Sequence, residues 1–553
     1  MNWLVSRRRL WSLGKFIGLS LLCCILVVSC NNPQSGTGSS TVSTTSAGNS
    51  ARLVVGTTLR PRTLDPADNY ELAGSNIMTS LSDRLYTYAI GTGELEPQLA
   101  TALPQVSADG LTYTIPVRQG VLFHDGTAFN AEAMAFSLNR FIQNGGKPAS
   151  LLSDVVDSVQ ASGEYELTIR LKNAFAAFPS LLAFSGLCAV SPQAYEIGTG
   201  KFKPREFVGT GPYRLVQFTP NLIRMDVFNE YWGEKPANQG IDFQILSSSA
   251  NLFNSFRTGQ VDIAYQTFDP EQVQSLKQQA ESQGWQALEE QSNVVTHLGL
   301  NAKQQPLDNP VVRQAIAAMI DRPLITKRVY QEQAEPLYSM IPNTFDSYQP
   351  VFQSTYGDGN VDQAKALLAQ AGFTRENPLS LEIAYPAYSL TREQVASTLQ
   401  EYGSQRLDGV VQIQTKAEEG ATFFANISKG IYQAVLLDWY PDFGDADNYI
   451  HPFLSCTEGS ATAGCEQGAS QSQGLFYYSD RMNQLIDQQR QEQNPQTREQ
   501  LFVQIQELIA QDVPAIPLVQ NKDYAFGQQT VQGLQVDPIL KLPLWNIAKG
   551  TKG

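Results

Sequence analysis

From residue 434 to residue 445 the chain reads AVLLDWYPDFGD. The first four residues are apolar, and a short apolar run of this kind is typical of a buried strand. The chain then enters a turn, marked by Pro441 and Gly444, that carries aromatic and acidic side chains. Because ligand sites of α/β proteins lie beyond the carboxyl ends of strands, this turn is a candidate binding site.

The turn contains the groups that a small-molecule site needs. Trp439, Tyr440 and Phe443 can form an aromatic wall. One of the aspartates can pair with a ligand ammonium. A solvated surface turn explains the same residues equally well. A calcium loop is a third interpretation, but the spacing lacks the Asp-x-Asp-x-Asp-Gly run and the closing Glu.

Composition and charge narrow the class of protein. The 553 residues are 42% hydrophobic and 17% charged, as in a globular protein with room for several domains. The formal net charge of −14 argues against nucleic-acid binding, which needs a basic surface. It favours, weakly, cationic or zwitterionic ligands. Helix and strand patterns mix along the chain, and no repeat is visible.

The N-terminus predicts export and a membrane anchor. Three arginines at residues 7–9 precede an apolar run at 16–28, the pattern of a secretory signal peptide over residues 1–29. Val27-Val28-Ser29-Cys30 resembles the lipobox of bacterial lipoproteins, which implies cleavage before Cys30 and lipidation of its sulfur. Up to residue 50 the chain is rich in Ser, Thr and Gly, so residues 30–50 are expected to be a flexible tether.

The remaining cysteines fit an oxidising compartment. Cys456 and Cys465 flank a short loop rich in Gly, Ser and Ala and are expected to form a disulfide. Cys188 lies in an apolar run and is expected to be a buried thiol. A zinc site is not expected, because the sequence lacks Cys-x-x-Cys and has only three histidines.

Periodicity and capping signals predict the main elements. Strands are expected at residues 53–56, 113–117, 165–171 and 434–437, with a hairpin at 213–218 and 223–228. Helices are expected after Asn130, Asn309, Asp321 and Asn360, each with a capping side chain, and as one long helix over 481–511 with its glutamines outside. The run GTGP at 209–212 is not a phosphate loop, because the third glycine is missing and a strand follows.

Several stretches together resemble one family. They are residues 64–66 (LDP), 109–113 (DGLTY), 118–126 (RQGVLFHDG), 208–213 (VGTGPY), 229–233 (NEYWG), 312–315 (VRQA), 320–322 (IDR), 365–373 (KALLAQAGF) and the stretch at 438–449. In this order they are similar to the extracellular solute-binding proteins of family 5. These proteins serve dipeptide, oligopeptide and nickel importers of the ATP-binding-cassette (ABC) class.

The resemblance implies a periplasmic-binding-protein-like fold (type II, cluster C) with two α/β lobes, a hinge and an additional domain. Lobe I is then discontinuous over residues 51–93, 210–298 and 513–553. The additional domain covers 94–209, and lobe II covers 299–512. The hinge is expected near residues 298–301 and 513–518.

The resemblance also implies site residues. In peptide-binding members, an Asp three residues after a Trp holds the ligand's ammonium, and this pattern falls on Trp439 and Asp442. Tyr440, Pro441 and Phe443 are expected to line the pocket. The facing wall is expected from Glu71, Leu72 and Ala73. No cationic residue for a ligand carboxylate can be identified from the sequence.

The implied function is capture of peptides by the substrate-binding component of an importer. The expected partners are a peptide and the ABC permease, and we expect a monomer that is not an enzyme and needs no cofactor. A nickel or metal-chelate binder is the alternative within the class, with His451 near the candidate site. A secreted hydrolase and a purely structural lipoprotein are further alternatives. The sequence lacks Gly-x-Ser-x-Gly and His-Glu-x-x-His motifs, which argues against the hydrolase.

Overall fold

The computed structural model describes residues 52–539 and 542–550. The predicted signal peptide, Cys30 and tether lie outside the described residues. The largest element is a sheet of eleven strands in the order β15-β14-β16-β12-β19-β11-β1-β10-β9-β8, with β13 paired to β19. Its strands are β1 (Leu53–Thr57), β8 (Tyr213–Phe218), β9 (Leu222–Val227), β10 (Gly240–Ile245), β11 (Ile263–Tyr265), β12 (Gln286–Leu300), β13 (Ala334–Pro336), β14 (Leu379–Pro386), β15 (Val411–Glu418), β16 (Ala434–Trp439) and β19 (Ala515–Gly527). The α/β class is therefore confirmed, as are the predicted strand before the candidate turn and the predicted hairpin.

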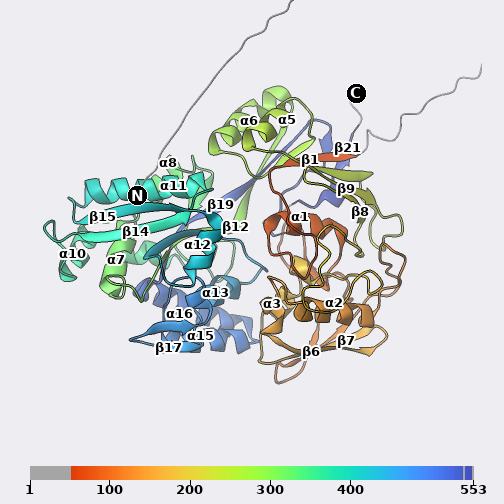
Figure 1. The fold of residues 1–553 in the computed structure, drawn as a ribbon, viewed down its shortest axis with the longest axis horizontal. Helices are drawn as coiled ribbons and strands as arrows, with labels where there is room; N and C mark the ends of the chain where they lie inside the picture. Colours follow the sequence, from red (N-terminus) through yellow and green to blue (C-terminus); the bar gives the residue numbers. More distant parts are fainter. Residues whose placement is uncertain (1–51, 540–541, 551–553) are drawn as a thin grey trace, which may run out of the picture. The chain divides into compact units, whose positions relative to one another are not determined.

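Two long strands, β12 and β19, connect the two halves of the sheet (Figure 1). They pair antiparallel, from Gln286 opposite Gly527 to Gly299 opposite Ala515, with irregularities between Gln291 and Val295 and between Thr296 and His297. At one end β19 pairs with β11, and at the other end β12 pairs with β16. Each long strand thus contributes to both halves.

The hydrophobic side chains of the two halves form separate cores, which define two lobes. Lobe one packs around β1, β8, β9, β10 and β11, and lobe two around β14, β15 and β16. The strand β19 supplies Ala525 to the first core and Leu518 to the second. Two lobes that share two strands can change their mutual angle by bending those strands.

Helices cover both lobes (Figure 1). Those of lobe one are α1 (Leu72–Leu81), α5 (Ser249–Arg257) and α6 (Pro270–Gln283). Those of lobe two are α7 (Pro310–Met319), α8 (Arg322–Arg328), α9 (Val351–Tyr356), α10 (Val361–Gln370), α11 (Leu390–Arg406), α12 (Gly420–Ile427), α13 (His451–Leu454), α14 (Ala469–Ser472), α15 (Asp480–Gln491) and α16 (Pro495–Asp512).

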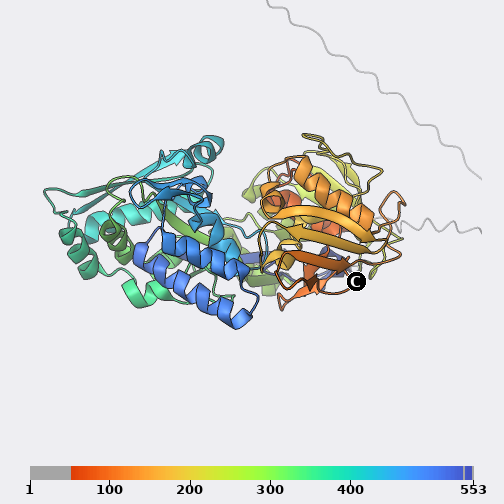
Figure 2. The same cartoon turned by 90° about the horizontal axis from the view of Figure 1, so that it is seen from below.

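A third core surrounds helix α2 (Ala131–Gln143), which packs on strands β6 (Val156–Gly163) and β7 (Glu166–Leu171) (Figures 1 and 2). These strands form a four-stranded sheet with β4 (Gln105–Val106) and β5 (Thr112–Pro116). The short helices α3 (Ser150–Ser153) and α4 (Phe178–Leu181) and the 3₁₀ turn η1 (Ser185–Leu187) complete this region.

The predicted helix starts are confirmed by their caps. The side chains of Asn130, Asn309, Asp321 and Asn360 each accept a hydrogen bond from a backbone N–H of the first helical turn, at 2.9, 3.0, 2.9 and 3.2 Å respectively. Such bonds satisfy donors that the helix itself leaves free. These starts could be predicted because capping depends on neighbouring residues alone.

The prediction of one helix over 481–511 is wrong. Helix α15 ends at Gln491, and α16 begins at Pro495 with Asn494 as its cap. Proline has no N–H to donate and disfavours a helical conformation in the residue before it, so the chain breaks here. The glutamines are also not all outside: Gln489 and Gln506 are fully buried.

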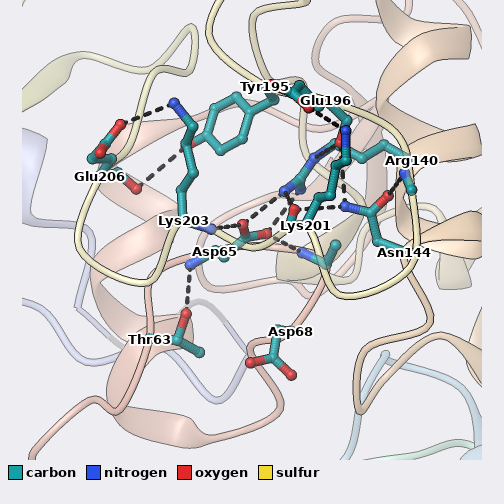
Figure 3. A network of polar contacts seen from close by, with 12 residues as sticks. Thr63, Asp65, Asp68, Arg140, Asn144, Tyr195, Glu196, Lys201, Lys203 and Glu206 are labelled. Carbon is teal, nitrogen blue, oxygen red and sulfur yellow. Dashed lines mark hydrogen bonds and ion pairs between the residues drawn. The ribbon is translucent and has the colours of Figure 1, made fainter.

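A buried ion pair joins lobe one to the third core (Figure 3). The Asp65 carboxylate accepts two hydrogen bonds from Arg140 of α2, at 2.8 and 2.7 Å, and a third from the backbone of Lys203 at 2.6 Å. Asp65 is 0% exposed and Arg140 is 1% exposed. The motif Leu64-Asp65-Pro66 therefore acts as a structural anchor.

Small elements complete the described chain. They are β2 (Tyr86–Tyr88), β3 (Leu95–Pro97), η2 (Ala446–Tyr449), β17 (Glu458–Ser460), β18 (Gly464–Gln467), β20 (Val531–Gln532), η3 (Leu544–Asn546) and β21 (Ala548–Lys549). Cys456 and Cys465 form a disulfide beside β17 and β18, and Cys188 is a buried free thiol. In the described ranges, no helix combines the length and the apolar character needed to cross a bilayer.

Candidate functional site

A cavity of about 490 Å³ lies between the two lobes. Its walls come from the start of α1 in lobe one and from the turn after β16 in lobe two. This volume falls within the range of about 300–1,000 Å³ that is typical of small-ligand sites. The positions of the predicted site residues relative to this cavity are described next, residue by residue.

The turn after β16 is held by the side chain of Asn448. Its Oδ1 accepts a hydrogen bond from the backbone N–H of Asp442 at 2.8 Å and one from Trp439 Nε1 at 3.3 Å. Asn448 is itself buried. The spacing of Trp439 and Asp442 is thus fixed by one amide that accepts from both residues.

Three of the four aspartates in this stretch already have cationic partners. Asp438 pairs with Arg392 at 2.5 Å, and Asp445 with Arg498 at 2.7 Å. Asp447 is within 3.7 Å of an arginine nitrogen. These partners also exclude a shared calcium site, because the carboxylates are directed to different side chains.

Asp442 is the exception. Among the described residues, no lysine, arginine or histidine nitrogen lies within 4 Å of its carboxylate. Its Oδ2 instead accepts a hydrogen bond at 3.1 Å from the hydroxyl of Tyr70, in lobe one. Burial raises the pKa of Asp442 to about 6, and the bond from Tyr70 opposes the rise. A partly desolvated carboxylate without a cation is well suited to receive a ligand ammonium.

The aromatic residues of the turn have different surroundings. Trp439 packs edge-on against Phe453, with ring centroids 4.9 Å apart. Tyr440 is 46% exposed, whereas Phe443 is buried and packs on Phe175 of the third core. All three aromatic residues, together with Pro441, line the cavity. Phe443 therefore also attaches the turn to the third core.

Two of the three residues predicted for the facing wall border the cavity. Glu71 and Leu72 line the cavity, but Ala73 does not. Ala73 instead lines a separate small cavity with Ile77, inside lobe one. Successive helical residues are about 100° apart around the axis, so Ala73 and Ile77, four residues apart, face the interior.

Sequence reasoning missed three residues of the site, Tyr70, Arg84 and Arg392. Tyr70 and Arg84 line the same cavity as Asp442. Arg392, on α11, lines an adjoining cavity of about 310 Å³ that shares Asp438 and Tyr440 with the first. No local motif marks these residues, because their position depends on how the lobes meet.

The described residues contain no group of three or more His, Cys, Asp or Glu side chains that could hold a metal ion. His451 does not line the 490 Å³ cavity, and burial lowers its pKa to about 3. Its imidazole is therefore neutral at physiological pH.

Comparison with known proteins agrees with this geometry. The model of the bacterial extracellular solute-binding proteins, family 5 middle, matches residues 94–461, more than half of the chain. The chain belongs to this family. The solute-binding protein is 26% identical to the dipeptide-binding protein of Escherichia coli (strain K12), over 85% of this chain and 89% of that protein.

Solved structures share the fold of this solute-binding protein. One is the dipeptide-binding protein from Pseudoalteromonas sp. SM9913 in complex with Met-Leu, with a TM-score of 0.74 and 22% identity over 90% of this chain and 99% of that chain. Another is NikA from Brucella suis in complex with Fe(III)-EDTA, with a TM-score of 0.77 and 18% identity over 90% and 99% of the chains. Both confirm a two-lobed, periplasmic-binding-protein-like fold for this family member.

Proposed function

We propose that this protein captures short peptides between its lobes and delivers them to an ABC permease. The observation that carries the proposal is Asp442, which faces the cavity without a cationic partner among the described residues. The names of the relatives support peptides as the ligand class. The protein binds its ligand without chemical turnover.

The ligand's α-ammonium pairs with Asp442 and displaces the hydroxyl of Tyr70. An ammonium has three donors, so it can bond the carboxylate and still reach neighbouring oxygens. Trp439 and Tyr440 contact the first side chain and peptide groups. This mode reads the terminus and backbone of the peptide and tolerates different side chains.

The C-terminal carboxylate is received by Arg392. Its Nη2 is bonded to Asp438 at 2.5 Å, but Nε and Nη1 are buried and have no partner among the described residues. A guanidinium has five N–H donors, so it can stay bonded to Asp438 and also donate hydrogen bonds to a second carboxylate. The two adjoining cavities give the peptide a path from Asp442 to Arg392.

Closure and delivery follow from the fold. The two lobes close around the peptide. Lobe I covers about residues 51–93, 210–298 and 513–553, the additional domain covers about 94–209, and lobe II covers about 299–512. A signal peptide exports the chain, and lipid on Cys30 holds it, as a monomer, at the outer face of the cytoplasmic membrane. The permease then accepts the peptide from the closed form.

Titration calorimetry with Ala-Ala and Ala-Ala-Ala on wild type and Asp442→Asn tests the proposal. Removing one partner of a desolvated ion pair costs about 3–5 kcal/mol, so we expect affinity to fall at least about 100-fold. Asp346→Asn is the matched control, because Asp346 is exposed and lines neither cavity. Equal affinities for wild type and Asp442→Asn would remove Asp442 from the site, and cleaved peptide after incubation would indicate an enzyme.

A metal chelate is the competing ligand. NikA from Brucella suis shares the fold and was solved with Fe(III)-EDTA. The protein should therefore also be titrated with nickel, with and without histidine, in the calorimeter. Binding of the chelate, with no response to any peptide, would replace the proposed function.

A further inference from the structure

Arg84 is a second cationic group of the site, beside Arg392 of the adjoining cavity. It lies just before β2, is 2% exposed, and lines the same cavity as Asp442. Its side chain donates one hydrogen bond, from Nη2 to Thr87 Oγ1 at 3.3 Å, and Nε has no partner in the described part of the chain.

The neighbouring Asp83 does not neutralise Arg84 by direct contact. Its carboxylate oxygens accept hydrogen bonds from four neutral donors, at 2.9–3.2 Å: Gln98 Nε2, Tyr231 OH, Thr210 Oγ1 and Trp232 Nε1. No carboxylate oxygen of the described residues lies within 4 Å of the Arg84 guanidinium.

The buried Arg313 also has no carboxylate partner, but it donates hydrogen bonds to four backbone carbonyls. Two further buried arginines have their charge compensated by a carboxylate. Arg140 pairs with Asp65 at 2.7 Å, and Arg392 pairs with Asp438 at 2.5 Å. A buried charge without a partner is unfavourable, and burial lowers the pKa of Arg84 accordingly. A cation that borders a ligand cavity can recover this loss when the ligand brings an anion.

We propose that Arg84 binds a carboxylate of the peptide, separate from the carboxylate that Arg392 receives. This inference rests on the proposed peptide-binding function. The guanidinium offers Nε and an Nη group in the planar arrangement that fits a carboxylate edge-on. The group it accepts is an acidic side chain of the peptide, so the protein selects peptides that contain Glu or Asp.

Calorimetry with matched dipeptides tests this assignment. The probes are Ala-Glu and Glu-Ala against the neutral isosteres Ala-Gln and Gln-Ala, plus Ala-Ala and its C-terminal amide. We expect wild type to bind at least one acidic peptide about 10- to 100-fold more tightly than its isostere, the range of one charged hydrogen-bond pair. Arg84→Gln should abolish this preference, and Arg84→Lys should retain part of it. Arg118→Gln is the control, because Arg118 belongs to the same region but stacks on Trp232 and lines neither cavity.

Each outcome decides the proposal. An acidic preference that is lost in Arg84→Gln but kept in Arg118→Gln supports it. If Arg84→Gln loses affinity for Ala-Ala but not for its amide, Arg84 binds the C-terminal carboxylate, and the assignment to an acidic side chain is overturned. No acidic preference in wild type, its survival in Arg84→Gln, or an equal loss for all probes including the amide overturns it. A wild-type protein that binds no peptide at all would instead overturn the proposed function, and this inference with it.

Discussion

At the scale of residues, the candidate site depends on two aspartates that have different hydrogen-bond partners. Asp438 and Asp442 are four residues apart, yet one has an arginine and the other has only a tyrosine hydroxyl. This difference is the basis for proposing Asp442, and not Asp438, as the partner of the ligand's ammonium. A surface turn kept soluble by its aspartates would not need such a division.

Peptide affinity is expected to depend on pH through Asp442. Its pKa is raised to about 6 without ligand, and an ammonium on the carboxylate favours the charged form and lowers it. Affinity should therefore be constant between about pH 7 and pH 8. It should fall by up to about tenfold per pH unit as pH drops through 6, and it should also fall above about pH 8 as the ligand's ammonium loses its proton.

Calorimetry near pH 6, in two buffers of different ionisation enthalpy, should show proton release on binding. The acid limb of the affinity profile should be absent from Asp442→Asn at whatever residual affinity remains. Burial also raises the pKa of Asp83 to about 6. The protonated form of Asp83 therefore contributes to folding stability at low pH, and this contribution is lost as pH rises through 6. Thermal stability would report on both carboxylates, so the pH dependence should be measured on peptide affinity. Proton uptake on binding would contradict the assignment of Asp442 to the ligand's ammonium.

At the scale of elements, the buried pair of Asp65 and Arg140 connects the loop after β1 to helix α2. Asp65→Asn leaves a buried guanidinium without its anion, so we expect the free energy of unfolding to fall by about 3–5 kcal/mol. Urea denaturation of wild type, Asp65→Asn and the double variant with Arg140→Met measures this loss.

The double variant gives the control for that prediction. Replacing both charges removes the unpaired cation, so it should be more stable than Asp65→Asn alone. A fall of less than about 1 kcal/mol in Asp65→Asn would show that the pair is a surface-like contact of small value.

Elements that depend on neighbouring residues could be predicted from the sequence. The strand at 434–439 and the caps at Asn130 and Asn309 required only local patterns. The break before Pro495 is also local, but the helical pattern on both sides concealed it. Tyr70 was missed for a different reason. It is 372 positions from Asp442 in the sequence, and only the assembled lobes bring its hydroxyl to 3.1 Å from the Asp442 carboxylate.

At the scale of the whole molecule, the proposed closure of the lobes requires β12 and β19 to bend, because these two strands connect the halves of the sheet. Their pairing is irregular between Gln291 and Val295, and Asn293 and Val294 line the ligand cavity. We infer that the hinge lies at this irregularity, nearer the cleft than the predicted residues 298–301.

Closure should be visible in solution. We expect the radius of gyration from small-angle scattering to decrease when a saturating peptide is added to wild type, and to stay constant in Asp442→Asn. Ligand at 100 times its Kd should also stabilise the folded protein by about 2.7 kcal/mol. An unchanged radius with full binding would mean that the lobes are already closed without ligand.

The position of β19 in the chain has a consequence for biosynthesis. This strand spans Ala515–Gly527, and its partners β11 and β12 begin more than two hundred residues earlier. Neither core is complete without it, so a nascent chain halted before residue 515 lacks the strand that joins its halves. The pairing that joins the two lobes therefore forms late in synthesis, and strand pairing between segments so distant in sequence is slow.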